Sequence, residues 1–261
     1  LPAGATLVDP LAPELLGLLV LVAGVAGCID AIAGGGGLLT LPALLWAGLP
    51  PVEALATNKL QGSFGTASAS LRFLRHGAID LRALGPVAAL TFVGAAAGSW
   101  LVGRIDPGAL ARLLPLLLVA FALYFLLSPR VGDLPSERRL GLTGFGVLAG
   151  AGIGFYDGAF GPGTGSFFAP AFVALLGRDL RQATAGSKLL NFASNLAALL
   201  VFAVGGHVAW GIGLAMAVGQ WTGAWLGAHL VIRHGARLVR PLLVAVSLLL
   251  SIRLLVQQLG A

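Results

Sequence analysis

Charged residues are scarce in this chain. Only 10% of its 261 residues are Asp, Glu, Lys or Arg, whereas 57% are hydrophobic, and the mean hydropathy is +0.94. A soluble domain usually carries about 25% charged residues, so the composition predicts an integral membrane protein. The net charge of +6 comes from residues in short loops rather than along one helix face. Nucleic acid is therefore not an expected partner.

Cysteine is almost absent. Cys28 is the only one, which excludes an internal disulfide and a cysteine-based metal cluster. The four histidines share no metal-ligand spacing, so we expect no metal site and no cofactor. The first ten residues lack the basic stretch that opens a signal peptide. No nucleophile and base occur in a recognisable pattern, so an enzyme is not expected.

Long apolar runs occupy most of the chain. A helix needs about 20 apolar residues to cross the bilayer core. Two shorter apolar runs, 38–48 and 166–176, reach about halfway at roughly 1.5 Å per residue. Each follows a glycine cluster, so we interpret them as half-helices whose ends are buried in protein or line a cavity. The long segments are 11–31, 52–74, 83–103, 109–127, 140–158, 182–204, 208–232 and 238–259.

One pattern occurs twice. GCIDAIAGGGGLLTLP followed by ATNKL matches GFYDGAFGPGTGSFFAP followed by AGSKLL. Asp30 and Asp157 are 127 residues apart, and Lys59 and Lys188 are 129 residues apart. Internal duplication with a polar, glycine-broken centre is typical of membrane transporters.

The number of segments predicts how the two copies are oriented. If each half-helix counts as one pass, a copy has five passes, and the second copy is inverted relative to the first. The predicted fold is an all-α, polytopic membrane protein with two inverted repeats, 1–133 and 134–261, each with four long helices and one half-helix. If a half-helix counts as no pass, the main loops keep their sides, but the turn at 177–182 moves to the outer side of the membrane.

Arginine placement predicts the orientation. By the positive-inside rule the arginine-rich side is cytoplasmic, which predicts a bacterial-type inner-membrane protein with both termini outside. Three arginines are assigned to the outer half, namely Arg104, Arg112 and Arg253. Eleven are assigned to the cytoplasmic side, namely Arg72, Arg75, Arg82, Arg130, Arg138, Arg139, Arg178, Arg181, Arg233, Arg237 and Arg240.

Two lysines, Lys59 and Lys188, lie at matched positions inside predicted spans. A lysine in the middle of a spanning helix costs about 2.5–3.5 kcal/mol, so each needs a partner or must snorkel to the interface. Polar residues follow both lysines at helical spacing, which predicts one polar face per helix. For Gln61 and Ser194 we expect hydrogen bonds between helices. Candidate substrate contacts on or beside these faces are Asn58, Lys59, Ser63, Ser187, Lys188 and Asn191.

The glycine clusters that open the half-helices predict an anion site. A helix N-terminus presents unpaired N–H groups and about half a positive charge, and glycine lets a ligand approach that backbone. In an inverted pair both N-termini meet near the membrane midplane. The alternative is that these glycines only break helices or let them pack, as we expect for Gly94, where alanine should have a mild effect. The predicted substrate contacts here are Gly35, Gly36, Gly37, Gly163, Thr164 and Gly165.

Asp30 and Asp157 precede the glycine clusters by four residues. A carboxylate inside the membrane is a functional candidate, because it can pair with a lysine, bind Na⁺ or carry a proton. We therefore predict both as ion-coupling residues. The structural alternative is a salt bridge or a cap for the half-helix N–H groups.

The segment GCIDAIAGGGGLLTLPALLWAGLPPVEALATNKLQ, with its echo around Asp157 and Lys188, resembles the sulfite exporter TauE/SafE family of membrane permeases. The similarity covers nearly the whole chain and is closer to the branch with IAGGGGLLTLPAL. It implies transport of small sulfur-containing anions such as sulfite or organosulfonates, coupled to a gradient of H⁺ or Na⁺. The second copy departs from the first, since Ser187 replaces Asn58 and Pro162 interrupts the glycines. This asymmetry argues against a strictly symmetric site.

The expected protein therefore binds a small anion near the midplane of a lipid bilayer and transports it by alternating access. Two alternatives stay open at this stage. One is an anion channel, and the other is a permease for another small carboxylate or oxyanion. Saturable, concentrative uptake distinguishes a transporter from a channel.

Overall fold

The computed structural model describes residues 13–127 and 137–234. Its regular elements there are helical, which confirms the predicted all-α class. The predicted segment 238–259 and residues 128–136 lie outside the described residues. The elements are α1 Pro13–Ala33, α2 Gly37–Trp46, α3 Pro51–Arg75, α4 Leu81–Val102, α5 Pro107–Leu127, α6 Leu142–Phe145, η2 Gly146–Ala151, α7 Gly152–Ala159, α8 Thr164–Leu176, α9 Leu180–Val204 and α10 Trp210–His234.

Two of these helices are short and apolar, as predicted. Helix α2 has 10 residues and α8 has 13, which corresponds to about 15 Å and 20 Å of length. Among the described helices, α1, α4 and α9 are long and apolar enough to cross a membrane by length and composition.

The first segment of the second copy is not a regular α-helix. The predicted helix 140–158 is divided into α6, the π-helix η2 and α7. Its counterpart α1 is one continuous α-helix. A π-turn adds one residue to a helical turn and is common at functional sites, so the copies differ in backbone as well as in side chains.

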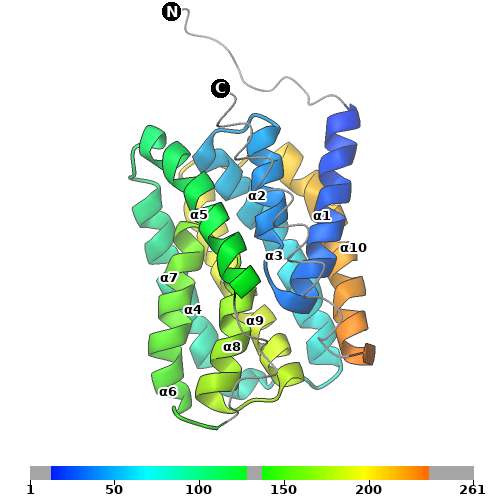
Figure 1. Cartoon of the computed structure of the whole chain (residues 1–261), viewed down its shortest axis with the longest axis vertical. Helices are drawn as coiled ribbons and strands as arrows, with labels where there is room; N and C mark the ends of the chain where they lie inside the picture. Colours follow the sequence, from blue (N-terminus) through cyan, green and yellow to red (C-terminus); the bar gives the residue numbers. More distant parts are fainter. Residues whose placement is uncertain (1–12, 128–136, 235–261) are drawn as a thin grey trace, which may run out of the picture.

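The two copies interleave in space. Helix α1 packs along α10, and α7 with η2 packs along α4. These contacts are equivalent. In each, the first helix of one copy packs along the long helix of the other copy that follows its lysine helix, namely α10 after α9 and α4 after α3. Helices α3 and α9 contact each other in the middle. In Figure 1, α1 runs downward from the top while α6 and α7 run upward, and α2 lies above α8.

The arginine-rich ends of several helices gather at one end of the bundle. The Arg72 side chain at the end of α3 is 2.6 Å from Nδ1 of His229 near the end of α10. The backbone N–H groups of Arg139 and Leu140 donate to Leu175 O near the end of α8, both at 2.9 Å. The start of α6 and the end of α10 lie at the lower end of Figure 1. This contact puts the end of α8 beside residues 138–140, as counting each half-helix as one pass requires.

Glycines hold α4 and α7 in backbone contact. A Cβ on Gly94 would lie under 3.0 Å from Ala151 O, and a Cβ on Gly98 equally close to Phe155 O. The predicted packing role of Gly94 is therefore confirmed, and alanine there would carry a cost, because the obstructing atom belongs to the backbone beside α7 and cannot rotate away. Small residues at such crossings are typical of membrane helices.

The contact between α1 and α10 repeats this arrangement. A Cβ on Gly223 would lie under 3.0 Å from Gly24 O, and a Cβ on Gly227 equally close to Cys28 O. The duplicated glycines thus occupy equivalent crossings. Each crossing ties one copy to the other.

Alanine at Gly98 or Gly227 should destabilise the protein by roughly 1–3 kcal/mol, the usual cost of overpacking. The measurement is the melting temperature of the purified protein in detergent. Gly85→Ala in α4 and Gly211→Ala in α10 are matched controls, because no heavy atom of a neighbouring described residue lies within 4 Å of a Cβ at either position. Melting of Gly98→Ala at the wild-type temperature would contradict the close contact.

Candidate functional site

Both intramembrane lysines are buried and paired with carboxylates of the other copy. Lys59 Nζ is 2.8 Å from Asp157 Oδ1, and Lys188 Nζ is 3.4 Å from Asp30 Oδ2. Lys59 is 1% exposed and Lys188 is 0% exposed. Snorkelling is therefore excluded. The four charges form two neutral pairs, so the lysines present no uncompensated positive charge.

Asp30 closes the N-terminus of half-helix α2. Its Oδ1 accepts hydrogen bonds from the backbone N–H groups of Gly35 at 3.0 Å and Gly36 at 3.1 Å. Lys188 Nζ also donates to the backbone oxygen of Asp30. Two of the N–H groups predicted to contact substrate are thus occupied by this carboxylate, which acts as the cap.

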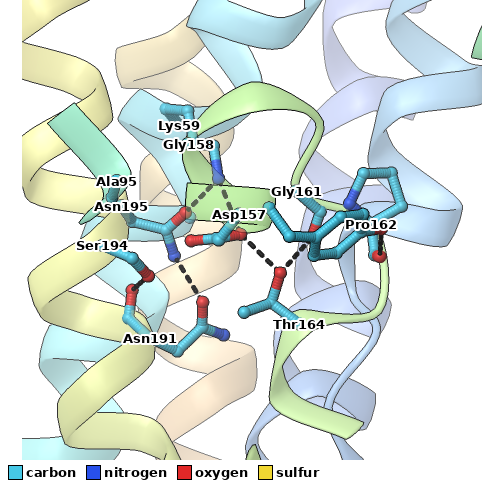
Figure 2. Close-up of polar contacts among 12 residues, drawn as sticks. Lys59, Ala95, Asp157, Gly158, Gly161, Pro162, Thr164, Asn191, Ser194 and Asn195 are labelled. Carbon is cyan, nitrogen blue, oxygen red and sulfur yellow. Dashed lines mark hydrogen bonds and ion pairs between the residues drawn. The ribbon is translucent and has the colours of Figure 1, made fainter. Parts of the chain in front are cut away.

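Asp157 occupies the matching position but makes different contacts. Its Oδ1 accepts from Thr164 Oγ1 at 2.5 Å as well as pairing with Lys59, as Figure 2 shows. Its Oδ2 is buried and accepts no hydrogen bond from the described residues. Gly163, at the N-cap of α8, has φ +82°, and no described side chain accepts from the backbone N–H groups at this helix start in the way that Asp30 does at α2. The two half-helix ends are therefore not equivalent.

The beginnings of the half-helices touch each other, as predicted. Ser166 Oγ in the first turn of α8 donates to Ala33 O at 2.7 Å. A Cβ on Gly34 would lie under 3.0 Å from the backbone of Gly165. Gly34 has φ +79°, so both the conformation and the space at this crossing require glycine.

A chain of amides leads from Lys59 to the start of α8. Lys59 Nζ donates to Asn195 Oδ1 at 3.2 Å, and Asn195 Nδ2 donates to Asn191 Oδ1 at 3.2 Å (Figure 2). An ammonium group can only donate, so the orientation of each amide follows from it. Asn191 Nδ2 is left as a donor with no hydrogen bond among the described residues, 3.6 Å from a Cβ placed on Gly165.

A second amide stands at the start of α2. Asn58 Oδ1 accepts from Thr40 Oγ1 at 2.6 Å and from Gln61 Nε2 at 2.7 Å. Asn58 Nδ2 makes no hydrogen bond to the described residues and lies 3.4 Å from a Cβ placed on Gly37. Each half-helix start therefore has one amide N–H group beside it that is available to an acceptor.

A small polar cavity lies among these groups, with a volume of about 20 Å³. A cavity of this size holds about one water molecule and is too small for a sulfonate. Its lining comes from both copies and consists of Asp30, Gly35, Gly37, Asn58, Gln61, Gly62, Thr66, Asp157, Gly161, Gly163, Thr164, Asn191, Asn195 and Gln220.

Most of the predicted site residues lie at or beside this cavity, and two point elsewhere. Ser63 Oγ donates to Lys59 O at 2.7 Å, and Ser187 Oγ donates to Thr184 O at 2.8 Å. Both hydroxyls are therefore used within their own helices. The predicted residues in the lining are Asp30, Gly35, Gly37, Asn58, Asp157, Gly163, Thr164 and Asn191, and those next to it but not in the lining are Gly36, Lys59, Gly165 and Lys188.

Sequence reasoning missed several residues of this centre, namely Gln61, Gly62, Thr66, Gly161, Asn195 and Gln220 in the lining and Tyr156 beside it. Gln220 in α10 lines the cavity, and its only signal is an amide in an otherwise apolar run. Asn195 lies on the predicted polar face of α9, and this position is its signal in the sequence. Tyr156 donates to Pro162 O at 2.5 Å and so fixes the second glycine loop. Within residues 13–127 and 137–234, no three His, Cys, Asp or Glu side chains are placed to hold a metal ion.

Apolar helices around buried, cross-paired charges and two broken helices define a polytopic membrane transporter. The comparisons with known proteins agree. The family model for sulfite exporter TauE/SafE matches residues 19–254. The chain belongs to this family.

Curated relatives cover nearly the whole chain. It is 49% identical over 243 residues to the probable membrane transporter protein YfcA of Escherichia coli K12, covering 93% of this chain and 90% of that protein. It is 47% identical over 245 residues to the probable membrane transporter protein ORF9 of Sinorhizobium sp, covering 94% of each. A probable membrane transporter protein of Haemophilus influenzae is 46% identical over 245 residues, covering 94% of this chain and 96% of that protein. No solved structure matches.

Removing one member of the Lys59–Asp157 pair should destabilise the folded protein more than removing both members. A single buried charge left without its partner costs about 3–5 kcal/mol, whereas loss of the pair is often nearly neutral. Lys59→Met and Asp157→Leu should each lower the melting temperature strongly, and the double variant should recover much of the loss.

The matched control is Lys59→Met combined with Asp30→Leu, which removes the same charges from different pairs. This combination should not recover stability, because Asp30 is paired with Lys188. Equal recovery in the two double variants would contradict the assigned pairing.

Proposed function

We propose that this protein transports small sulfur-containing anions, such as sulfite and short organosulfonates, across the bacterial inner membrane by alternating access coupled to an ion gradient. The observation that supports this most is the pair of unused amide donors, Asn58 Nδ2 and Asn191 Nδ2. Both belong to the lining of one cavity, and each lies beside a half-helix start. The family name points to the same class of substrate.

The chemistry of the site suits a small oxyanion. Sulfite and sulfonates present three oxygens that accept hydrogen bonds, and amide N–H and hydroxyl groups donate without adding charge. The N-terminus of α8 adds partial positive charge, and none of the described side chains accepts a hydrogen bond from its first backbone N–H groups. Because the Lys–Asp pairs are neutral, the anion is held by dipoles and amides rather than by a bare lysine.

The size of the cavity supports a conformational cycle. At about 20 Å³ it is too small for the proposed substrate, so binding needs side chains or helices to move apart. We infer that the two copies are inverted repeats, as the opposite directions of α1 and α6–α7 suggest (Figure 1). Movement of one half-helix group against the other would then expose the site to each side in turn.

Asn58→Leu and Asn191→Leu should each raise the KM for anion uptake roughly ten- to a hundredfold, since a hydrogen bond to a charged group contributes about 1.5–3 kcal/mol. The measurement is saturable uptake of radiolabelled sulfite and methanesulfonate into proteoliposomes. Gln182→Leu, on the exposed first turn of α9, is the control. Wild-type KM in both Asn variants would overturn the proposed site.

Gly37 allows a finer test of the same site than Gly36 does. A Cβ on Gly37 meets Asn58 Nδ2 and Pro162 Cα at 3.4 Å, which is ordinary contact, whereas a Cβ on Gly36 would lie 2.8 Å from Ala26 O. Gly37→Ala should therefore fold and lower anion affinity.

Uptake by the wild-type protein distinguishes a transporter from a channel. Uptake that neither saturates nor concentrates the anion would indicate a channel.

Orientation is tested by single cysteines in a Cys28→Ser background. His76→Cys and Gln182→Cys should be protected from a membrane-impermeant maleimide in intact cells, because both follow arginine-rich ends assigned to the cytoplasm. Ala109→Cys lies in the first turn of α5, at the end of the bundle assigned to the outside, and should be labelled. All three positions are exposed. Labelling of His76→Cys from outside would reverse the orientation.

A further inference from the structure

Three acceptor oxygens at the cavity have no donor. Asp157 Oδ2, Gln61 Oε1 and Gln220 Oε1 are buried and accept no hydrogen bond from any described residue. The three residues are 1%, 1% and 3% exposed. They come from α7, α3 and α10, and all belong to the lining of the same cavity. In Figure 2 no dashed line reaches the second oxygen of Asp157.

Such a set of oxygens calls for a positive ligand. Buried acceptors are almost always satisfied, and here one carboxylate and two amide carbonyls remain unsatisfied together. A water molecule donates at most two hydrogen bonds and a proton on Asp157 supplies one, so neither alone satisfies the three oxygens, whereas a single cation bound among them would. Carboxylate and carbonyl oxygens are the ligands that hard cations prefer, and similar broken-helix sites in transporters bind Na⁺.

The orientation of Gln61 supports this assignment. Its Nε2 donates to Asn58 Oδ1 at 2.7 Å, so its Oε1 is the atom left over. The volume of about 20 Å³ admits one ion or one water molecule. Of the two carboxylates in the lining, Asp30 and Asp157, only Asp157 has an oxygen that accepts no hydrogen bond from the described residues. Lys59 already neutralises that carboxylate, so a divalent ion is disfavoured.

We propose that the cavity holds one Na⁺, bound by Asp157 Oδ2, Gln61 Oε1 and Gln220 Oε1, and that this ion is the coupling ion of the proposed anion transport. The surrounding charges, Lys59, Lys188, Asp30 and Asp157, sum to zero. Bound Na⁺ would therefore give the centre a net charge of +1 just where the anion binds. Linkage requires that the anion raise Na⁺ affinity by the same factor by which Na⁺ raises anion affinity.

The test measures Na⁺ binding without any transported anion, so it is independent of the proposed substrate. The melting temperature of the purified protein and the binding of radiolabelled Na⁺ are followed in sodium gluconate against choline and potassium gluconate. Sodium alone should stabilise the wild type. Gln220→Met, which keeps every charge, should weaken Na⁺ binding by at least about tenfold, and so should Asp157→Asn.

Gln182→Met, at an exposed position, is the control and should bind Na⁺ like the wild type. Absence of a sodium-specific effect, or an equal effect in Gln220→Met and the wild type, would overturn the proposal and leave a water or a proton at the site. Sodium binding together with failure of sulfite and sulfonate uptake would retain the cation site and reject the proposed substrate class.

Discussion

The buried ammonium groups of Lys59 and Lys188 are the constraint on which the rest of the structure depends. A lysine away from water needs a counter-charge, and each finds it in the other copy of the duplicated pattern, at 2.8 Å from Asp157 and 3.4 Å from Asp30. The carboxylates precede the glycine turns, so pairing brings both half-helix starts together. The glycine crossings of α1 with α10 and of α4 with α7 then hold the interleaved copies at backbone contact.

The two pairs have similar charge but different chemistry. Asp30 uses one oxygen to cap α2 and the other to meet Lys188. Asp157 uses one oxygen for both Lys59 and Thr164, and the other remains without a donor. Both oxygens of the first carboxylate are therefore engaged, whereas the second carboxylate has one oxygen that accepts no hydrogen bond from the described residues. In our proposal the unused amide donors of Asn58 and Asn191 bind the anion, and the unused acceptor oxygens of Asp157, Gln61 and Gln220 bind the cation.

Much of this arrangement could be predicted from the sequence, because membrane helices and broken helices leave direct marks. Hydrophobic length predicts the spans, and the glycine clusters predict α2 and α8 within two residues of their observed starts. The duplicated Asp and Lys identify the charged centre. The partner of each charge could not be predicted, since Asp30 lies close in sequence to Lys59 but pairs with Lys188.

Other features depend on three-dimensional contacts that no local pattern encodes. A packing role for Gly94 could be predicted, but not that α7 crosses there at backbone distance. The hydroxyls of Ser63 and Ser187 lie on polar faces, yet they bond within their own helices. Gln220 gives only a single amide as a signal, in a helix that pairs with α1 and α3. Register and crossing geometry decide which polar groups reach the cavity.

The most direct test of this account is an experimental structure of the protein in a lipid nanodisc with a saturating small sulfonate. We expect ligand density between the amide groups of Asn58 and Asn191, beside Thr164, with Lys59 still bound to Asp157 and Lys188 to Asp30. Density located instead on lysines that have left their aspartates, or away from the two half-helix starts, would contradict the account.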